Sequence, residues 1–232
     1  MSGPVLLQGG GEFSPACLPM DAAFVREVGG PVVVTALAGA VGREYETATR
    51  NGVRHYAAAA GAGVEVLAAP DVREDPAAAV AVLRRARMIV LPGGSPSRLL
   101  DVLTATAAGD VVRTLLAAGG ALSGSSAGAM VLGAWTVLPE RPGPEVRPGL
   151  GLVPGVLVLP HWSGGRPDWL AAIERGVPDD TLLLGLPEES GVVVREGALA
   201  AVGVAPTRLL RQGRDLPVGE SWELPVTREE PR

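Results

Sequence analysis

The stretch ALSGSSAGAMVLG, residues 121–133, contains a Gly-x-Ser-x-Gly pattern at Gly124, Ser126 and Gly128. The apolar residues ahead of this pattern are typical of a buried strand, and the small residues from Ala127 onward are typical of a helix. Ser126 then lies on a tight turn, where flanking glycines let strand and helix approach closely while the hydroxyl projects from the sheet. Because a plain strand-to-helix turn has the same composition, the pattern alone fits both a structural turn and a nucleophile.

Strand and helix patterns alternate along most of the chain. Short apolar runs are typical of strands covered on both faces, and they alternate with helical segments without hairpin signals. This alternation predicts an α/β fold with an open, mainly parallel sheet and helices on both faces. We expect strands at residues 4–7, 32–36, 64–68, 88–91 and 155–160. We expect one helix that ends near residue 28, another that begins after residue 95, and further helices at 43–60, 75–85, 109–118 and 166–175.

The last part of the chain has a different pattern. Apolar segments at 182–186, 192–195 and 198–204 follow one another without helices between them, so we expect short antiparallel strands at the C-terminus. The prolines within 140–148 predict a surface loop, and the polar residues 227–232 predict a flexible tail. With 232 residues and 47% hydrophobic content, we expect a single domain over residues 1–232.

Composition excludes several classes of chemistry. The net charge is -5 and the arginines are scattered, which argues against a nucleic-acid surface or an anionic membrane patch. The absence of lysine excludes Schiff-base, Ser–Lys and P-loop mechanisms, and the single cysteine, Cys17, excludes an internal disulfide and a multi-cysteine zinc site. We therefore expect no metal and no organic cofactor. Because the sequence shows no secretory signal and no apolar run of membrane length, we expect a cytoplasmic protein without nucleic-acid or membrane partners.

Only two histidines are available to activate a serine. A serine nucleophile near neutral pH usually needs an imidazole to take its proton. His55 lies inside an expected helix, where a solvated or packed histidine is the ordinary expectation. His161 directly follows an expected strand, at the place where open α/β sheets present reactive groups, so it is the better candidate base.

A carboxylate is expected to hold the imidazole in the reactive orientation. Glu188 and Glu189 follow an expected strand, and Glu140 lies on the loop shortly after the nucleophile helix. We rank Glu188 first, Glu189 second and Glu140 third, although paired glutamates are often only a solvated corner.

A second turn is expected to face Ser126 across the same crevice. Gly93 and Gly94 follow the strand at 88–91, which we expect to neighbour the strand that leads to Ser126. The backbone N–H groups of Gly94 and Ala127 are therefore candidates for an oxyanion hole.

The glycine-rich segment 8–12 follows the first expected strand. It fails as a dinucleotide fingerprint, because Ser14 stands in place of the third glycine and no basic residue lies near for a phosphate. We interpret it as a tight strand-to-helix turn beside the active site.

The order of the candidate residues along the chain separates classes of hydrolase. Ordinary α/β-hydrolases place nucleophile, acid and histidine in that order, whereas here the order is Ser126, His161, Glu188. Class I glutamine amidotransferases share the order of this chain but use a cysteine, and Cys17 is far from the Gly-x-Ser-x-Gly pattern.

Six short motifs occur together in this chain: GGGE at 9–12, PGG at 92–94, GSSAGA at 124–129, GLG at 149–151, HW at 161–162 and GLPE at 185–188. Their combination, which spans nearly the whole chain, resembles the dipeptidase E and cyanophycinase family of serine peptidases. The resemblance implies a class I glutamine amidotransferase-like fold and hydrolysis of peptide bonds next to aspartyl residues. It also implies that Ser126 is the nucleophile, that His161 is the base and, in the cyanophycinase branch, that Glu188 is the orienting carboxylate.

Departures from the family pattern concern the substrate pocket. Cyanophycinases carry Asp-Gln before the histidine and several arginines after it, whereas this chain has Leu-Pro before it and mainly Arg166 after it. The aspartate that the dipeptidase E branch carries after the nucleophile is also missing, with Arg141 near that place. We keep Arg166, as a contact to a substrate carboxylate, and Trp162 as candidate substrate-binding residues.

The leading hypothesis is a serine hydrolase that cleaves a peptide or amide bond of a small, for example aspartyl, peptide through an acyl-enzyme. One alternative is a non-catalytic small-molecule or peptide-binding protein of the same fold, and another is an esterase or amidase that acts on a non-peptide substrate. The sequence leaves the oligomeric state open, with a homodimer as one alternative.

Overall fold

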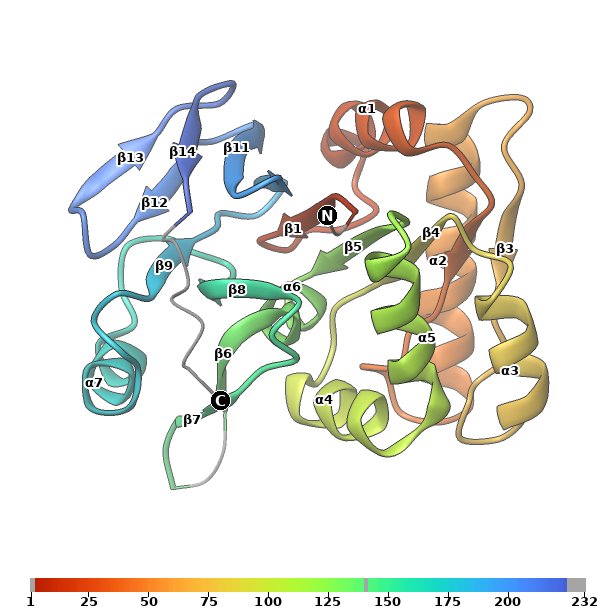
Figure 1. The fold of residues 1–232 in the computed structure, drawn as a ribbon, viewed down its shortest axis with the longest axis horizontal. Helices are drawn as coiled ribbons and strands as arrows, with labels where there is room; N and C mark the ends of the chain where they lie inside the picture. Colours follow the sequence, from red (N-terminus) through yellow and green to blue (C-terminus); the bar gives the residue numbers. More distant parts are fainter. Residues whose placement is uncertain (1–2, 140–141, 225–232) are drawn as a thin grey trace.

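The computed structural model describes residues 3–139 and 142–224 and contains two β-sheets (Figure 1). Strands β1, β5, β4, β2 and β3 of the first sheet run parallel, and β10, β11 and β14 continue the sheet from β1 in antiparallel fashion. The predicted α/β fold, mainly parallel with antiparallel strands near the C-terminus, is confirmed. In spatial order, the described strands of this sheet are β14 (Ser221–Glu223), β11 (Ala198–Gly203), β10 (Ser190–Arg195), β1 (Val5–Gln8), β5 (Ala121–Ser125), β4 (Met88–Leu91), β2 (Val32–Val34) and β3 (Val66–Ala68).

Helices cover both faces of the first sheet because successive side chains of its strands point to opposite faces and both sets are apolar. Leu6, Val32 and Val34 face the core formed with α1 and α2, whereas Leu7 and Val33 face the core formed with α3, α4, α5 and α6. These helices are α1 (Leu18–Val28), which follows the short 3₁₀ helix η1 (Pro15–Cys17), α2 (Arg43–Ala60), α3 (Pro76–Leu83), α4 (Pro96–Ala105), α5 (Ala107–Ala117) and α6 (Ala127–Leu132). Among the residues that the structure describes, no helix is both long enough and apolar enough to cross a membrane.

A second sheet lies beside the first and carries helix α7 (Pro167–Gly176), at the end of the molecule opposite α3 (Figure 1). Its central strands β6, β8 and β9 run parallel, and its outer strands pair antiparallel. Ile173 of α7 packs with Leu157 and Leu183 in a core of their own. In spatial order, the described strands are β13 (Arg214–Leu216), β12 (Thr207–Leu209), β9 (Leu182–Gly185), β8 (Val153–Leu159), β6 (Gly133–Leu138) and β7 (Glu145–Pro148).

Three expectations from the sequence are corrected by this second sheet. The strand expected at 182–186 as one of the antiparallel C-terminal strands, β9, runs parallel to β8 and antiparallel only to β12. The strand expected at 155–160 does not extend the first sheet, because β8 pairs with β6 and β9 instead. The surface loop expected at 140–148 is wrong for its second half, where β7 pairs with β6 in the register Trp135 to Pro148. Proline is tolerated there because β7 is an edge strand. Residues 140–141 and the tail expected at 227–232 lie outside the described residues.

The parallel strands β1, β5 and β4 bring three loops to the same edge of the first sheet. Gln8 of β1 lies opposite Ser125 of β5, and Leu91 of β4 lies opposite Gly124. The prediction that the turn after 88–91 and the turn at Ser126 follow neighbouring strands is confirmed. The carboxyl ends of parallel strands are where open α/β sheets bind ligands.

Candidate active site

Ser126 occupies a strained turn between β5 and α6. Its φ of 48° and ψ of -109° place a non-glycine residue in the left-handed half of conformational space, which costs of the order of 1–3 kcal/mol. Its backbone N–H donates to the Gln8 carbonyl oxygen over 3.0 Å, so the end of β1 holds the turn. A Cβ on Gly124 would lie 2.6 Å from the carbonyl carbon of Gly128, and a Cβ on Gly128 would lie 2.0 Å from the Leu91 carbonyl oxygen. Both positions therefore require glycine, as the sequence pattern indicated.

His161 follows β8, and its imidazole lies against the backbone of Gly10. The backbone N–H of His161 donates to the Gly9 carbonyl oxygen over 2.7 Å. A Cβ on Gly10 would lie 2.3 Å from Cε1 and 2.5 Å from Nδ1 of His161, so glycine leaves the space that the ring occupies. In this position Nε2 of His161 is 2.8 Å from Oγ of Ser126.

Glu188 follows β9 and reaches the other ring nitrogen of His161. Its Oε1 atom is 2.9 Å from Nδ1, and the Glu188 side chain is 63% exposed. With the imidazole proton on Nδ1, Nδ1–H donates to Glu188 and Nε2 is free to accept the Ser126 hydroxyl proton. The neighbouring Glu189 contacts the glycine-rich loop. Its backbone N–H donates to the Gly10 carbonyl oxygen, and its Cγ lies near Gly11. The third candidate carboxylate, Glu140, lies outside the described residues.

The turn after β4 lies directly beside the nucleophile. A Cβ on Gly93 would lie 3.2 Å from Cβ of Ser126. Gly94 has a φ of 140°, and a Cβ there would lie 2.7 Å from the Ala38 carbonyl oxygen, so only glycine fits the turn. Ala127 is the first residue of α6, where backbone N–H groups have no acceptor within the helix. The two candidate oxyanion donors thus belong to turns at the same edge of the sheet.

Glu12 also belongs to this region, and sequence reasoning assigned no role to it. Its Oε1 accepts the backbone N–H of Gly93 over 2.7 Å, and its Oε2 accepts the Ser125 hydroxyl over 3.0 Å. Its position could have indicated a role, because Glu12 is a carboxylate at the end of the glycine-rich loop that follows β1. Its partners are 81 and 113 residues away in sequence, so their proximity appears only in the fold.

The two candidate substrate-binding residues follow His161 in sequence. The indole of Trp162 lies against Gly185, since a Cβ there would be 2.6 Å from its Cγ. The Arg166 guanidinium stacks at 4.7 Å over the ring of Trp169. A role for Trp162 and Arg166 in substrate binding stays a prediction.

His55 and Cys17 both belong to the interior. Nε2 of His55 lies 2.7 Å from Oδ2 of Asp21, and both side chains are buried. The Tyr56 hydroxyl and the Gln8 side-chain amide donate to the other oxygen of Asp21. Burial raises the pKa of the Cys17 thiol, which disfavours the nucleophilic thiolate. Within residues 3–139 and 142–224, no group of three or more His, Cys, Asp or Glu side chains is arranged to hold a metal ion.

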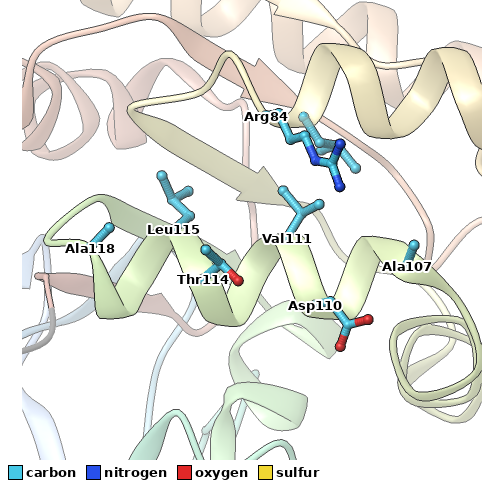
Figure 2. Close-up of a pocket in the computed structure, with 8 residues that line it drawn as sticks. Arg84, Ala107, Asp110, Val111, Thr114, Leu115 and Ala118 are labelled. Atoms are coloured by element: carbon cyan, nitrogen blue, oxygen red, sulfur yellow. The ribbon is translucent and has the colours of Figure 1, made fainter.

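A surface pocket away from the candidate active site lies between α3 and α5 and has a volume of about 360 Å³ (Figure 2). Val111 and Leu115 of α5 and Arg84 after α3 line it. Its lining is largely apolar and contains none of the residues of the candidate active site.

Comparison with known proteins assigns the chain to a family of peptidases. The model of peptidase family S51 matches residues 37–202, which is well over half of the chain. The chain belongs to peptidase family S51. The resemblance to the dipeptidase E and cyanophycinase family is thereby confirmed, and the chain is a serine-type peptidase.

Two solved structures resemble this S51 peptidase over most of its length. A peptidase from an acI-B1 Actinobacterium shares 27% sequence identity with a TM-score of 0.80, covering 96% of this chain and 97% of that one. A protein of Listeria monocytogenes EGD-e that is named for peptidase E shares 18% identity with a TM-score of 0.65, covering 88% of this chain and 100% of that one. The second likeness shows the fold alone. No curated protein matches the sequence.

Proposed function

We propose that this S51 peptidase cleaves a peptide or amide bond of a small peptide through the triad Ser126, His161 and Glu188. The observation that carries the proposal is the continuous contact from Oγ of Ser126 to Nε2 of His161 at 2.8 Å and from Nδ1 of His161 to Oε1 of Glu188 at 2.9 Å. Both distances lie within the range expected for a nucleophile, its base and the group that orients the base.

The chemistry of the triad follows from these contacts. The Ser126 hydroxyl attacks the carbonyl carbon of the scissile bond while Nε2 of His161 accepts its proton. The resulting imidazolium donates that proton to the leaving amine, and Glu188 stabilises its charge and its orientation. Water then attacks the acyl-enzyme with His161 again acting as base. This sequence of steps requires no metal ion and no organic cofactor.

The oxyanion that forms in both tetrahedral intermediates needs hydrogen-bond donors. We assign this role to the backbone N–H groups of Gly94 and Ala127, which lie on the two turns next to Ser126. Preorganised donors of this kind typically contribute a factor of about 10²–10³ to the rate of acyl transfer.

A peptide with an aspartyl residue beside the scissile bond is the first substrate to test. The family resemblance supports this choice, and Arg166, which follows His161 in sequence, is the candidate cation for a substrate carboxylate. Trp162, adjacent to the base in sequence, is the candidate apolar wall of the pocket.

A fluorophosphonate probe tests the proposal, because it reacts with a serine only when a base and an oxyanion site activate that serine. Wild-type protein is expected to be labelled, and the Ser126→Ala variant is not. Ser221→Ala is the matched control, since it removes an exposed hydroxyl on β14 and leaves Ser126 in place. A wild-type protein that stays unlabelled, or equal labelling of wild type and Ser126→Ala, would contradict the proposal and favour a binding protein.

A library of dipeptides, aspartyl and non-aspartyl, together with simple ester and amide substrates, then identifies the bond that is cleaved. We expect dipeptides to be hydrolysed at higher kcat/KM than the esters and amides. Turnover of the esters alone would assign the same triad to an esterase.

A further inference from the structure

Glu12 connects the two turns that flank the reacting centre. One carboxylate oxygen accepts the Gly93 N–H at 2.7 Å, and the other accepts the Ser125 hydroxyl at 3.0 Å. An ionised carboxylate only accepts hydrogen bonds, so two donors on opposite oxygens satisfy it well. One side chain of the β1 loop thereby ties the turn after β4 to the turn after β5.

On the β4 side, Glu12 fixes the residue that precedes the candidate oxyanion donor. Gly93 is held by Glu12, and the N–H of Ser95 donates to the Ala38 carbonyl oxygen over 3.0 Å. Gly94 therefore lies between two anchored positions. Loss of Glu12 removes the first of these two anchors and leaves the peptide that carries the Gly94 N–H less constrained.

On the β5 side, Glu12 holds the side chain next to the nucleophile. Ser125 is buried, and its hydroxyl is directed to Glu12 rather than into the site. The backbone N–H of Ser126 is held at the same time by the Gln8 carbonyl oxygen. Both bonds come from the β1 strand and its loop, so the strained turn is fixed from one direction at two points.

We propose that Glu12 is a positioning residue of the peptidase, which holds the Gly94 N–H at the correct distance and angle from Ser126. The proposal rests on the catalytic role of Ser126 given above. Glu12 acts as an acceptor of two hydrogen bonds, and its charge is not required. A glutamine can make both contacts, because its carbonyl oxygen accepts the Gly93 N–H and its amide donates to the Ser125 hydroxyl.

The test compares Glu12→Ala and Glu12→Gln with wild type by fluorophosphonate labelling over a range of probe concentrations. For Glu12→Ala we expect the maximal labelling rate to fall about 10- to 100-fold with little change in the half-saturating probe concentration, because an oxyanion donor acts in the transition state. For Glu12→Gln we expect recovery to within about threefold of wild type, because the glutamine carbonyl oxygen still accepts the Gly93 N–H and its amide keeps the contact to Ser125 as a donor. Ser125→Ala removes one of the two contacts. We expect its maximal labelling rate to lie between the rates of Glu12→Ala and Glu12→Gln.

The matched control is Asp75→Ala. Asp75 is a carboxylate that accepts a backbone N–H, that of Ala78, at 3.0 Å at the start of α3, so its loss removes a similar bond outside the site. We expect this variant to lower the melting temperature and to leave the labelling rate unchanged. If Glu12→Ala does not fold, Glu12→Gln and Ser125→Ala still test the proposal.

The outcomes separate the positioning role from the proposed function. Labelling of Glu12→Ala at the wild-type rate, equal loss in Glu12→Ala and Glu12→Gln, or wild-type labelling of Ser125→Ala would each overturn the positioning role while leaving the triad intact. A wild-type protein that is not labelled at all would overturn the proposed function and this inference with it.

Discussion

The protein contains two histidine–carboxylate pairs of nearly the same length in very different surroundings. His55 and Asp21 are 2.7 Å apart with side chains 6% and 1% exposed, whereas His161 and Glu188 are 2.9 Å apart with side chains 39% and 63% exposed. In the buried pair the imidazole and carboxylate belong to a hydrogen-bond network inside the core between α1 and α2. In the exposed pair the second imidazole nitrogen faces a serine on a strained turn. The distance within the pair is thus uninformative, and exposure together with the third partner separates a structural pair from a reactive one.

Asp21→Ala gives the largest effect we expect on stability. It leaves His55, the Gln8 amide and the Tyr56 hydroxyl without their shared acceptor in the core, so we expect the free energy of unfolding to fall by about 3 kcal/mol or more. Urea denaturation measures this change. The labelling rate per folded molecule should stay within about threefold of wild type, because the Ser126–His161 contact is untouched. A stable Asp21→Ala variant would show that the network contributes little to the fold.

Gly10→Ala tests how closely the reactive pair is fitted to the loop after β1. The added methyl group would lie 2.3 Å from the His161 ring and must displace it, so we expect a loss of about 100-fold in kcat or in labelling rate. Gly164→Ala is the matched control, since Gly164 also has a positive φ but has no atom within 4 Å of its Cβ position. Equal rates for the two variants would contradict the tight fit of the ring against Gly10.

Glu188→Ala is the direct counterpart of Asp21→Ala in the exposed pair. We expect kcat to fall about 10- to 100-fold, because the imidazole loses the group that fixes its tautomer and orientation. The free energy of unfolding should change by less than about 0.5 kcal/mol, because an exposed pair contributes little to stability. Kinetic assays and urea denaturation on the same preparation measure both quantities. A large loss of stability with unchanged turnover would reverse the roles that we assign to the two pairs.

The sequence predicted those helices and strands that have a long amphipathic period or a compact apolar run. The helix at 43–60 and the strand at 88–91 have the predicted bounds, because long amphipathic periodicity and a compact apolar run are clear signals. Strands β12 and β13 of the second sheet were missed because they have three residues each, too few for an alternation to be read. Strand β6 was missed because it follows α6 without an intervening turn.

In the candidate site, too, local sequence patterns predicted some residues, whereas contacts that depend on strand order were missed. Ser126, His161 and Glu188 could be proposed from sequence because each follows a recognisable apolar strand, and the structure brings their side chains together. The contacts of Glu12 could not be predicted, because they depend on the pairing of β1 with β5 and of β5 with β4. Long-range contacts of this kind follow from strand order, which the local pattern does not specify.

The decisive measurement of the reactive pair of Ser126 and His161 is to map the fluorophosphonate adduct by peptide mass spectrometry in wild type, His161→Ala and His55→Gln. We expect one adduct on Ser126 in wild type, loss of the adduct in His161→Ala, and an adduct on Ser126 in folded His55→Gln. An adduct on another residue, or one that depends on His55 and survives the loss of His161, would contradict it.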